Sequence, residues 1–199
     1  MRRIMIMLSL ALSCAGAPAR AETIALGSLG VRVEKPDDWH VISLEAYRAN
    51  LARLAPGKLK DMAKQSSSPL IAFFKYTEPH PDINPSFKIL MRSVSLPDHV
   101  TALDIATTVV AQMQVVLPGA TFEQPLEWST IGGRRAAHFR MAYPLEVGAA
   151  TFPIVSEMWL VRRGPEVFMI GVTRRADETE AVKAEFARVV DSVRIDDGG

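Results

Sequence analysis

The chain has 199 residues, of which 48% are apolar and 23% are charged. This length fits one domain of ordinary size, and the apolar fraction is too high for a disordered chain. The 23 Lys and Arg residues nearly balance the 22 Asp and Glu residues, which disfavours a nucleic-acid-binding protein that relies on a strongly basic surface. A single Cys excludes a disulfide within the chain and a zinc site of four cysteines.

The start of the chain has the pattern of a secretion signal. Two arginines are followed by an almost wholly apolar run over residues 4–15, and small residues stand at positions 19 and 21, as signal peptidase requires. The run of about 12 residues is shorter than the about 20 that a spanning helix needs. We therefore predict a signal peptide at 1–21, cleaved between Ala21 and Glu22. The mature protein would be periplasmic or secreted, with no transmembrane anchor.

Two alternatives to a cleaved leader are an uncleaved membrane anchor and lipid attachment at Cys14. The three residues before Cys14 match a lipobox poorly. Beyond the leader, residues 22–195 contain only short breaks and no repeat, so they predict a single domain. Residues 196–199 are expected to form a disordered tail.

The first half of the mature chain alternates between strand and helix patterns. Extended segments are expected at 31–34 and 39–43, a helix follows at 44–54, and strands rich in Phe and Ile follow at 70–76 and 87–94. A second helix is predicted over 101–117, where Thr101 and Asp104 suit a capping box. Its apolar stripe has helical spacing and consists of Leu103, Ala106, Val110, Met113 and Leu117.

The last third reads as a run of strands closed by a helix. Segments 151–162 and 167–173 are joined by a tight turn and should pair antiparallel. Both alternating sets of residues in Val167–Val172 are apolar, so this strand should be buried on both faces. The closing helix, from about Asp177, can cover one face and the helix at 101–117 another. We therefore predict an α+β fold, a three-layer α/β/α sandwich with a mostly antiparallel sheet of about six strands.

The order of several motifs resembles the PsbP-like superfamily, which includes Mog-type proteins and DcrB-type envelope proteins. The motifs are the entry strand Val31-Arg32-Val33 followed by Pro36 and Trp39, the turn Gly132-Gly133-Arg134, and the closing helix that runs into Val193-Arg194-Ile195. The resemblance implies an α/β/α sandwich. It also implies an accessory or binding protein without a shared catalytic centre, although the fold does not determine one function.

Paired arginines stand at the ends of the predicted strands. If these ends gather on one rim, they would form a basic patch that binds a carboxylate, a phosphate head group or an acidic partner. The alternative is that they are solvated strand ends, compensated by Glu166, Asp177 and Glu178. The candidate binding residues are Arg134, Arg135, Arg162, Arg163, Arg174 and Arg175.

A polar loop presents three residues that could bind a metal ion. Glu78, His80 and Asp82 alternate with prolines, and their oxygen and nitrogen atoms are ligands for divalent cations. An extended proline-rich backbone directs successive side chains apart, so a stiff exposed loop is the alternative.

One histidine is a candidate general base. His138 would face Glu157 if their strands pair, and a carboxylate orients an imidazole for proton transfer. No nucleophile elbow, His-Glu-x-x-His motif or phosphate-binding glycine loop accompanies the pair, so an ordinary hydrogen-bonded histidine is the alternative.

These observations lead to three hypotheses about function. The first is a secreted, non-enzymatic envelope protein that binds another protein or envelope component through a sheet edge or an Arg-rich rim. The second is a carrier or sensor for a small apolar or anionic ligand, which a cavity near Trp39 or Trp159 would favour. The third is a metal-assisted hydrolase that uses His80 or His138. No cofactor is expected, and the sequence does not specify an oligomeric state.

Overall fold

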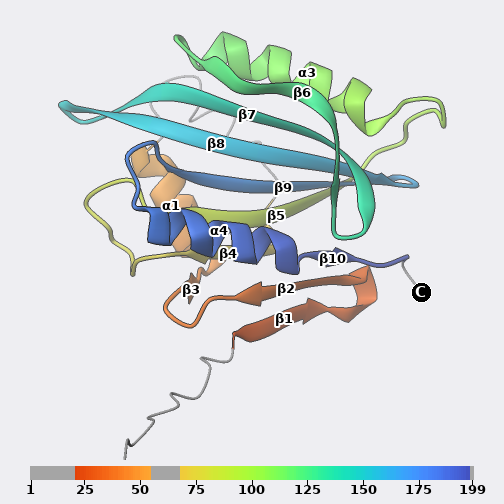
Figure 1. Ribbon diagram of the computed structural model, residues 1–199, viewed down its shortest axis with the longest axis horizontal. Helices are drawn as coiled ribbons and strands as arrows, with labels where there is room; N and C mark the ends of the chain where they lie inside the picture. The colour runs from red at the N-terminus through yellow and green to blue at the C-terminus, as the bar shows by residue number, and fades with distance from the viewer. Residues whose placement is uncertain (1–20, 55–67, 198–199) are drawn as a thin grey trace, which may run out of the picture.

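A computed structural model describes residues 21–54 and 68–197 (Figure 1). The leader predicted at 1–21 lies outside these residues except for Ala21. The helices are α1 (Leu44–Leu54), α3 (Ala102–Val116) and α4 (Glu180–Ser192), with a short 3-10 helix at Gly27–Leu29. The strands are β1 (Glu22–Leu26), β2 (Val31–Lys35), β3 (His40–Val41), β4 (Ile71–Phe74), β5 (Ser86–Ser93), β6 (Thr121–Ile131), β7 (Arg134–Val147), β8 (Ala150–Arg163), β9 (Glu166–Arg175) and β10 (Arg194–Ile195).

A large antiparallel sheet contains seven strands in the order β3-β4-β5-β9-β8-β7-β6. The predicted pairing of β8 with β9 is confirmed, with Arg163 opposite Glu166 at the turn and Ile154 opposite Arg175 at the far end. The sheet was expected to hold about six strands. Seven are present, and the extended segment expected at 39–43 contributes β3, a two-residue edge strand that pairs with β4.

Strand β9 lies between β5 and β8, in the interior of the large sheet. Phe168 and Ile170 are fully buried on one face, while Met169 faces the other side and packs against a second apolar cluster. This arrangement confirms the prediction that Val167–Val172 is covered on both faces.

A second sheet of three strands was not predicted. The chain places β2 between β1 and β10, so the beginning and the end of the domain are hydrogen-bonded together. Val31 and Val33 are fully buried, and they pack against the same apolar cluster as α4.

The segment expected to be a disordered tail is attached to the domain where the structure describes it. The Asp196 N–H donates to Gly30 O at 2.8 Å, and Asp197 forms an ion pair with Arg134. Residues 198–199 lie outside the described residues.

Helix α3 packs on one face of the large sheet. Its capping box is present as predicted, because Thr101 accepts from the Asp104 N–H and Asp104 accepts from the Thr101 N–H. Ala102 and Ala106 are buried, and they belong to one cluster with Phe139 of β7 and Leu160 of β8. Larger apolar residues of α3, including Leu103, Val110 and Met113, pack against the same cluster.

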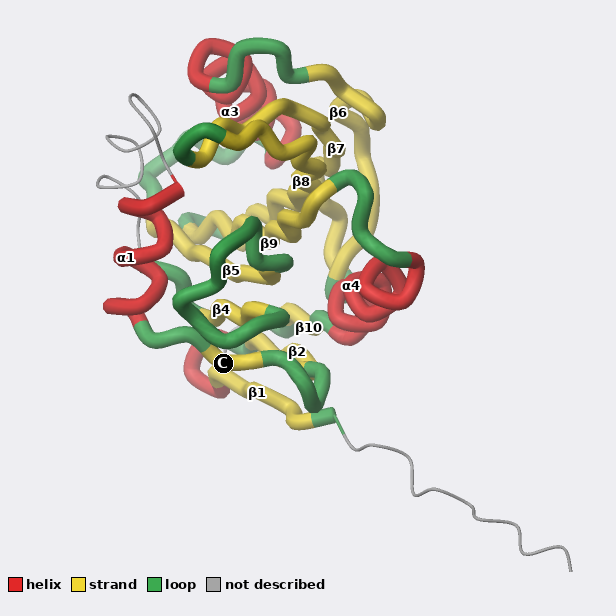
Figure 2. The backbone as a smooth tube through the Cα atoms, turned by 90° about the vertical axis from the view of Figure 1, so that its left-hand side faces the viewer, coloured by secondary structure: helices red, strands yellow, loops and turns green. Residues whose placement is uncertain are grey.

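The opposite face of the large sheet is covered by α4 together with the small sheet (Figures 1 and 2). Phe186 of α4 contacts Trp39 edge to face, with ring centroids 4.9 Å apart. Figure 2 shows α1 and α4 on opposite sides of the large sheet. One covering layer thus contains both strands and a helix, and the three-layer α/β/α description stays a prediction.

Candidate functional site

The candidate site is a hollow of about 400 Å³ between α4 and the large sheet. The sheet contributes Arg140 from β7, Glu157 and Trp159 from β8, and Val172 and Arg174 from β9. The helix contributes Lys183, Phe186, Ala187, Val190 and Asp191. The hollow therefore combines an apolar lining with charged groups of both signs.

The sheet register brings the polar groups of the hollow together. Arg140 stands directly opposite Glu157, and His138 stands opposite Trp159, so all four side chains share one face. The His138 Nε2 lies 2.7 Å from Glu157 Oε1, and the His138 ring stacks on Trp159 with centroids 4.5 Å apart. The predicted contact between His138 and Glu157 is confirmed.

Glu157 is an ionised carboxylate held by two partners. Burial by itself would raise the pKa of Glu157, but the hydrogen bonds from His138 and Arg140 and the charge of Arg140 together lower it below its ordinary value. The Arg140 Nε and one terminal nitrogen donate to Glu157 Oε2 at 3.1 and 2.9 Å. Because a carboxylate only accepts, His138 Nε2 is the donor in its contact with Glu157.

This arrangement fixes the orientation of the imidazole. His138 is 5% exposed, and its Nε2 proton is directed at Glu157. The neighbouring hydroxyl of Ser156 points to the other face of the sheet, where it contacts Tyr143 and Thr173. The ordinary structural alternative for His138 therefore fits the geometry.

Arg174 is the cation of the hollow whose charge is least compensated. Its terminal nitrogen donates to the backbone O of Arg175 at 3.0 Å, and it forms no ion pair among the residues that the structure describes. Burial and the nearby charge of Arg140 lower the pKa of Arg174, and three carboxylates that act through space do not offset them. Lys183, in contrast, is paired with Glu180 at 2.7 Å.

The six arginines proposed as one basic patch do not gather on one rim. Arg174 pairs with Val155 of β8, whereas Arg163 lies eight residues further along β8. At about 3.3 Å per residue, the two ends of the strand are about 26 Å apart. Arg134, Arg135, Arg162 and Arg163 therefore lie towards one end of the sheet, and Arg174 and Arg175 lie at the other.

Most of these arginines contact the protein itself. Arg163 binds Glu166 and the carbonyls of Leu29 and Asp196, which ties the β8–β9 turn to the small sheet. Arg134 donates to Ile195 O at 2.8 Å. Three others also have partners: Arg162 with carbonyls of the 96–100 loop, Arg135 with the Trp128 ring, and Arg175 with Asp82 and Asp177.

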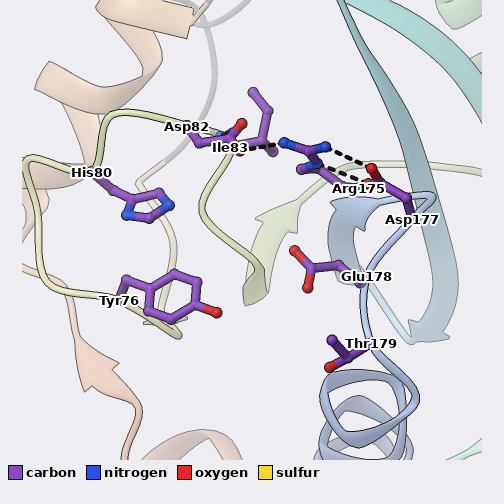
Figure 3. Close-up of a pocket in the computed structure, with 8 residues that line it drawn as sticks. All are labelled: Tyr76, His80, Asp82, Ile83, Arg175, Asp177, Glu178 and Thr179. Atoms are coloured by element: carbon purple, nitrogen blue, oxygen red, sulfur yellow. Dashed lines mark hydrogen bonds and ion pairs between the residues drawn. The ribbon is translucent and has the colours of Figure 1, made fainter.

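The three side chains predicted as metal ligands do not converge on one point. Glu78 accepts from the Asn50 and Asn84 amides at 2.7 and 2.9 Å, while the His80 ring stacks on Tyr76. Asp82 points instead to Arg175, as Figure 3 shows. Within the described part of the chain, no group of three or more His, Cys, Asp or Glu residues could hold a metal ion. The alternation with proline directs the side chains apart.

Two solved structures share the arrangement of these elements. LpqN of Mycobacterium tuberculosis, a protein described as involved in cell envelope biogenesis, aligns over 88% of this chain and 90% of its own, with 12% identity and a TM-score of 0.55. CyanoP, the cyanobacterial PsbP of Synechocystis, aligns over 94% of this chain and 98% of its own, with 14% identity and a TM-score of 0.51. The chain has a PsbP-like fold.

The PsbP-like fold confirms the resemblance at the level of structure. No family model matches the sequence, and no curated protein matches it either. No helix within residues 21–54 and 68–197 has the length and apolar character needed to cross a membrane.

Sequence reasoning did not single out two cations of the hollow. Arg140 could have been found, because it lies two residues after His138 in a predicted strand and therefore on the same face. Lys183 carried no such signal, since only the packing of α4 on the PsbP-like sheet brings it to this face.

Proposed function

We propose that the protein is a secreted, non-enzymatic accessory protein of the cell envelope that binds another envelope component. The observation that carries this proposal is the PsbP-like fold shared with LpqN over nearly the whole described domain, since LpqN is described as involved in cell envelope biogenesis. The leader pattern of residues 1–21 supports export.

The state of the candidate catalytic groups supports a non-enzymatic role. The ionised Glu157 is engaged by His138 and Arg140, and Glu78, His80 and Asp82 each have separate partners. A general base also needs a reacting group within hydrogen-bond reach, and His138 is only 5% exposed, which leaves a substrate little access to its ring.

A second candidate function is a carrier or sensor for a small ligand. The hollow beneath α4 is lined by Trp159, one of the two tryptophans near which a cavity would favour this role. It favours this role over binding through an Arg-rich rim, because the strand-end arginines are divided between two ends of the sheet.

Export and binding are tested together on the full chain produced in a Gram-negative host. Mass analysis of the periplasmic fraction should give a protein that begins at Glu22, and native mass spectrometry should show it with a bound envelope component. Retention of the protein in the cytoplasm, or a diacylated Cys14, would contradict the proposed processing. A bare protein in every native spectrum would contradict the binding role.

A further inference from the structure

One cation of the hollow, Arg174, is available to pair with an anionic ligand. Arg140, Arg174 and Lys183 line it, and two carboxylates, Glu157 and Asp191, share the lining. Glu157 is engaged by His138 and Arg140, and Lys183 is paired with Glu180 outside the lining. Arg174 remains as the cation without an ion-pair partner among the described residues.

A half-buried guanidinium in this position favours a partner of opposite charge. Arg174 has lost part of its hydration, and Arg140 adds repulsion from the same sheet face. Its planar donor groups match a carboxylate or phosphate, which accepts two hydrogen bonds side by side. A bound anion would therefore supply the interaction that the described residues do not.

The rest of the lining selects an apolar group attached to that anion. Apolar residues line the hollow on both sides, Trp159 and Val172 from the sheet and Phe186 and Val190 from α4. A hollow of about 400 Å³ is within the range of small-molecule sites, which combine an apolar lining with a few polar groups.

From this combination we infer that the hollow between α4 and the sheet binds a small amphipathic anion, with its carboxylate or phosphate on Arg174 and its apolar part against Trp159 and Phe186. This inference rests on the proposed function, because it names the ligand class of the same binding protein. The two head groups share one chemistry, and titration with one probe of each kind separates them.

The probes are octanoate and octyl phosphate, titrated into the mature protein by isothermal titration calorimetry. Octanol and octyltrimethylammonium have the same apolar chain with a neutral or a cationic head, and acetate and inorganic phosphate have the head without the chain. We expect one of the two amphipathic anions to bind with one-to-one stoichiometry, at least about tenfold more tightly than any other probe class. Comparison of the two assigns the head group.

Three variants locate the site. Arg174→Gln should weaken binding by at least about tenfold, because it removes the charge-assisted hydrogen bonds. Arg92→Gln is the matched control, since this exposed arginine of β5 pairs with Val167 near the other end of β9 and should leave binding unchanged. Ala187→Trp, at an exposed position of α4, should fill the hollow and abolish binding without disturbing the core.

Circular dichroism and the melting temperature establish that each variant is folded. Equal binding of the neutral, cationic and anionic probes would overturn the inference. It would also fall if folded Arg174→Gln and Ala187→Trp bound the anions like the parent, or if no amphipathic anion bound at all. The envelope role fails on a different readout, because it predicts export and a component retained in native spectra whatever the probes do.

Discussion

At the scale of residues, Glu157 connects the polar groups of the α4 face. One carboxylate oxygen accepts from His138 and the other accepts from Arg140, and both partners come from β7. The His138 ring also covers Trp159, so the polar contacts and the apolar packing depend on the same positions. Removing the charge of Glu157 should affect both.

The first prediction concerns Glu157→Gln. The substitution leaves Arg140 without its carboxylate and weakens the hydrogen bond from His138, so the free energy of unfolding at pH 7 should fall by about 2 kcal/mol. Urea unfolding followed by circular dichroism measures this difference. Glu146→Gln, an exposed position of the same hairpin, should leave stability nearly unchanged.

The pH dependence follows from the lowered pKa of Glu157. Since the folded protein holds this pKa below its ordinary value of 4.5, the ionised carboxylate stabilises the protein fully above that value. The contribution is lost as pH falls through the lower folded pKa. The stability difference between the parent and Glu157→Gln should therefore shrink below pH 4.5. A difference that stays constant down to acid pH would contradict the ionised state of Glu157.

At the scale of elements, α3 is stabilised by local hydrogen bonds at its start and by tertiary packing against the sheet. The capping box of Thr101 and Asp104 satisfies free N–H groups at the start of the helix and needs no tertiary partner. The hydrogen bonds from Thr101 lower the pKa of Asp104. Packing then depends on Ala102 and Ala106, whereas Val115 is 69% exposed.

The second prediction concerns Thr101→Ala. Loss of the cap should lower the free energy of unfolding by about 1 kcal/mol, because the first turn of α3 is left with an unsatisfied N–H. Thr101→Ser should retain most of the stability. Thr108→Ala serves as the comparison on the same helix, since the hydroxyl of this exposed residue bonds only a helix carbonyl, and its stability should stay within about 0.5 kcal/mol of the parent. Equal losses at both positions would argue against the cap.

At the scale of the whole molecule, strand β10 connects the two sheets. The Ile195 N–H donates to Gly132 O at 3.2 Å, so β10 touches the β6–β7 turn of the large sheet while it pairs with β2 of the small one. Arg134 reinforces the same junction through Ile195 O. The two sheets are thus joined through residues that are far apart in sequence.

The third prediction compares Gly132→Ala with Gly133→Ala. Both glycines have positive φ, 60° and 77°, so each alanine is expected to cost about 1 kcal/mol of backbone strain. A Cβ at Gly132 would lie 3.1 Å from the Ile195 backbone N, whereas a Cβ at Gly133 has no neighbour within 4 Å. Gly132→Ala should therefore be the more destabilising of the two in urea unfolding.

Hydrogen exchange distinguishes steric crowding by the new Cβ at position 132 from the backbone strain that both variants share. The Ile195 amide should exchange faster in Gly132→Ala and remain protected in Gly133→Ala, since the Cβ at Gly132 displaces β10. Equal destabilisation and equal protection would mean that the junction between the sheets does not depend on this close approach.

The candidate site was predictable only where contacts follow from strand pairing. The expected hairpin partners brought His138 to Glu157, because residues on one face of paired strands meet at a regular spacing. Strand pairing alone could not predict whether the arginines at strand ends lie on one rim. Residue spacing places arginines at strand ends, but the length of β8 and β9 separates Arg163 from Arg174.

The sequence by itself determined the elements whose signals are local: the capped α3, the strand pair across residues 163–166, and the doubly apolar β9. These follow from hydrogen bonds and periodicities that span a few residues. Only the tertiary structure decided that β10 joins β2, and that Lys183 of α4 lines the same hollow as Arg140 and Arg174 of the sheet. The physical reason is that such contacts depend on how whole faces pack, and residues far apart in sequence carry no local pattern that pairs them.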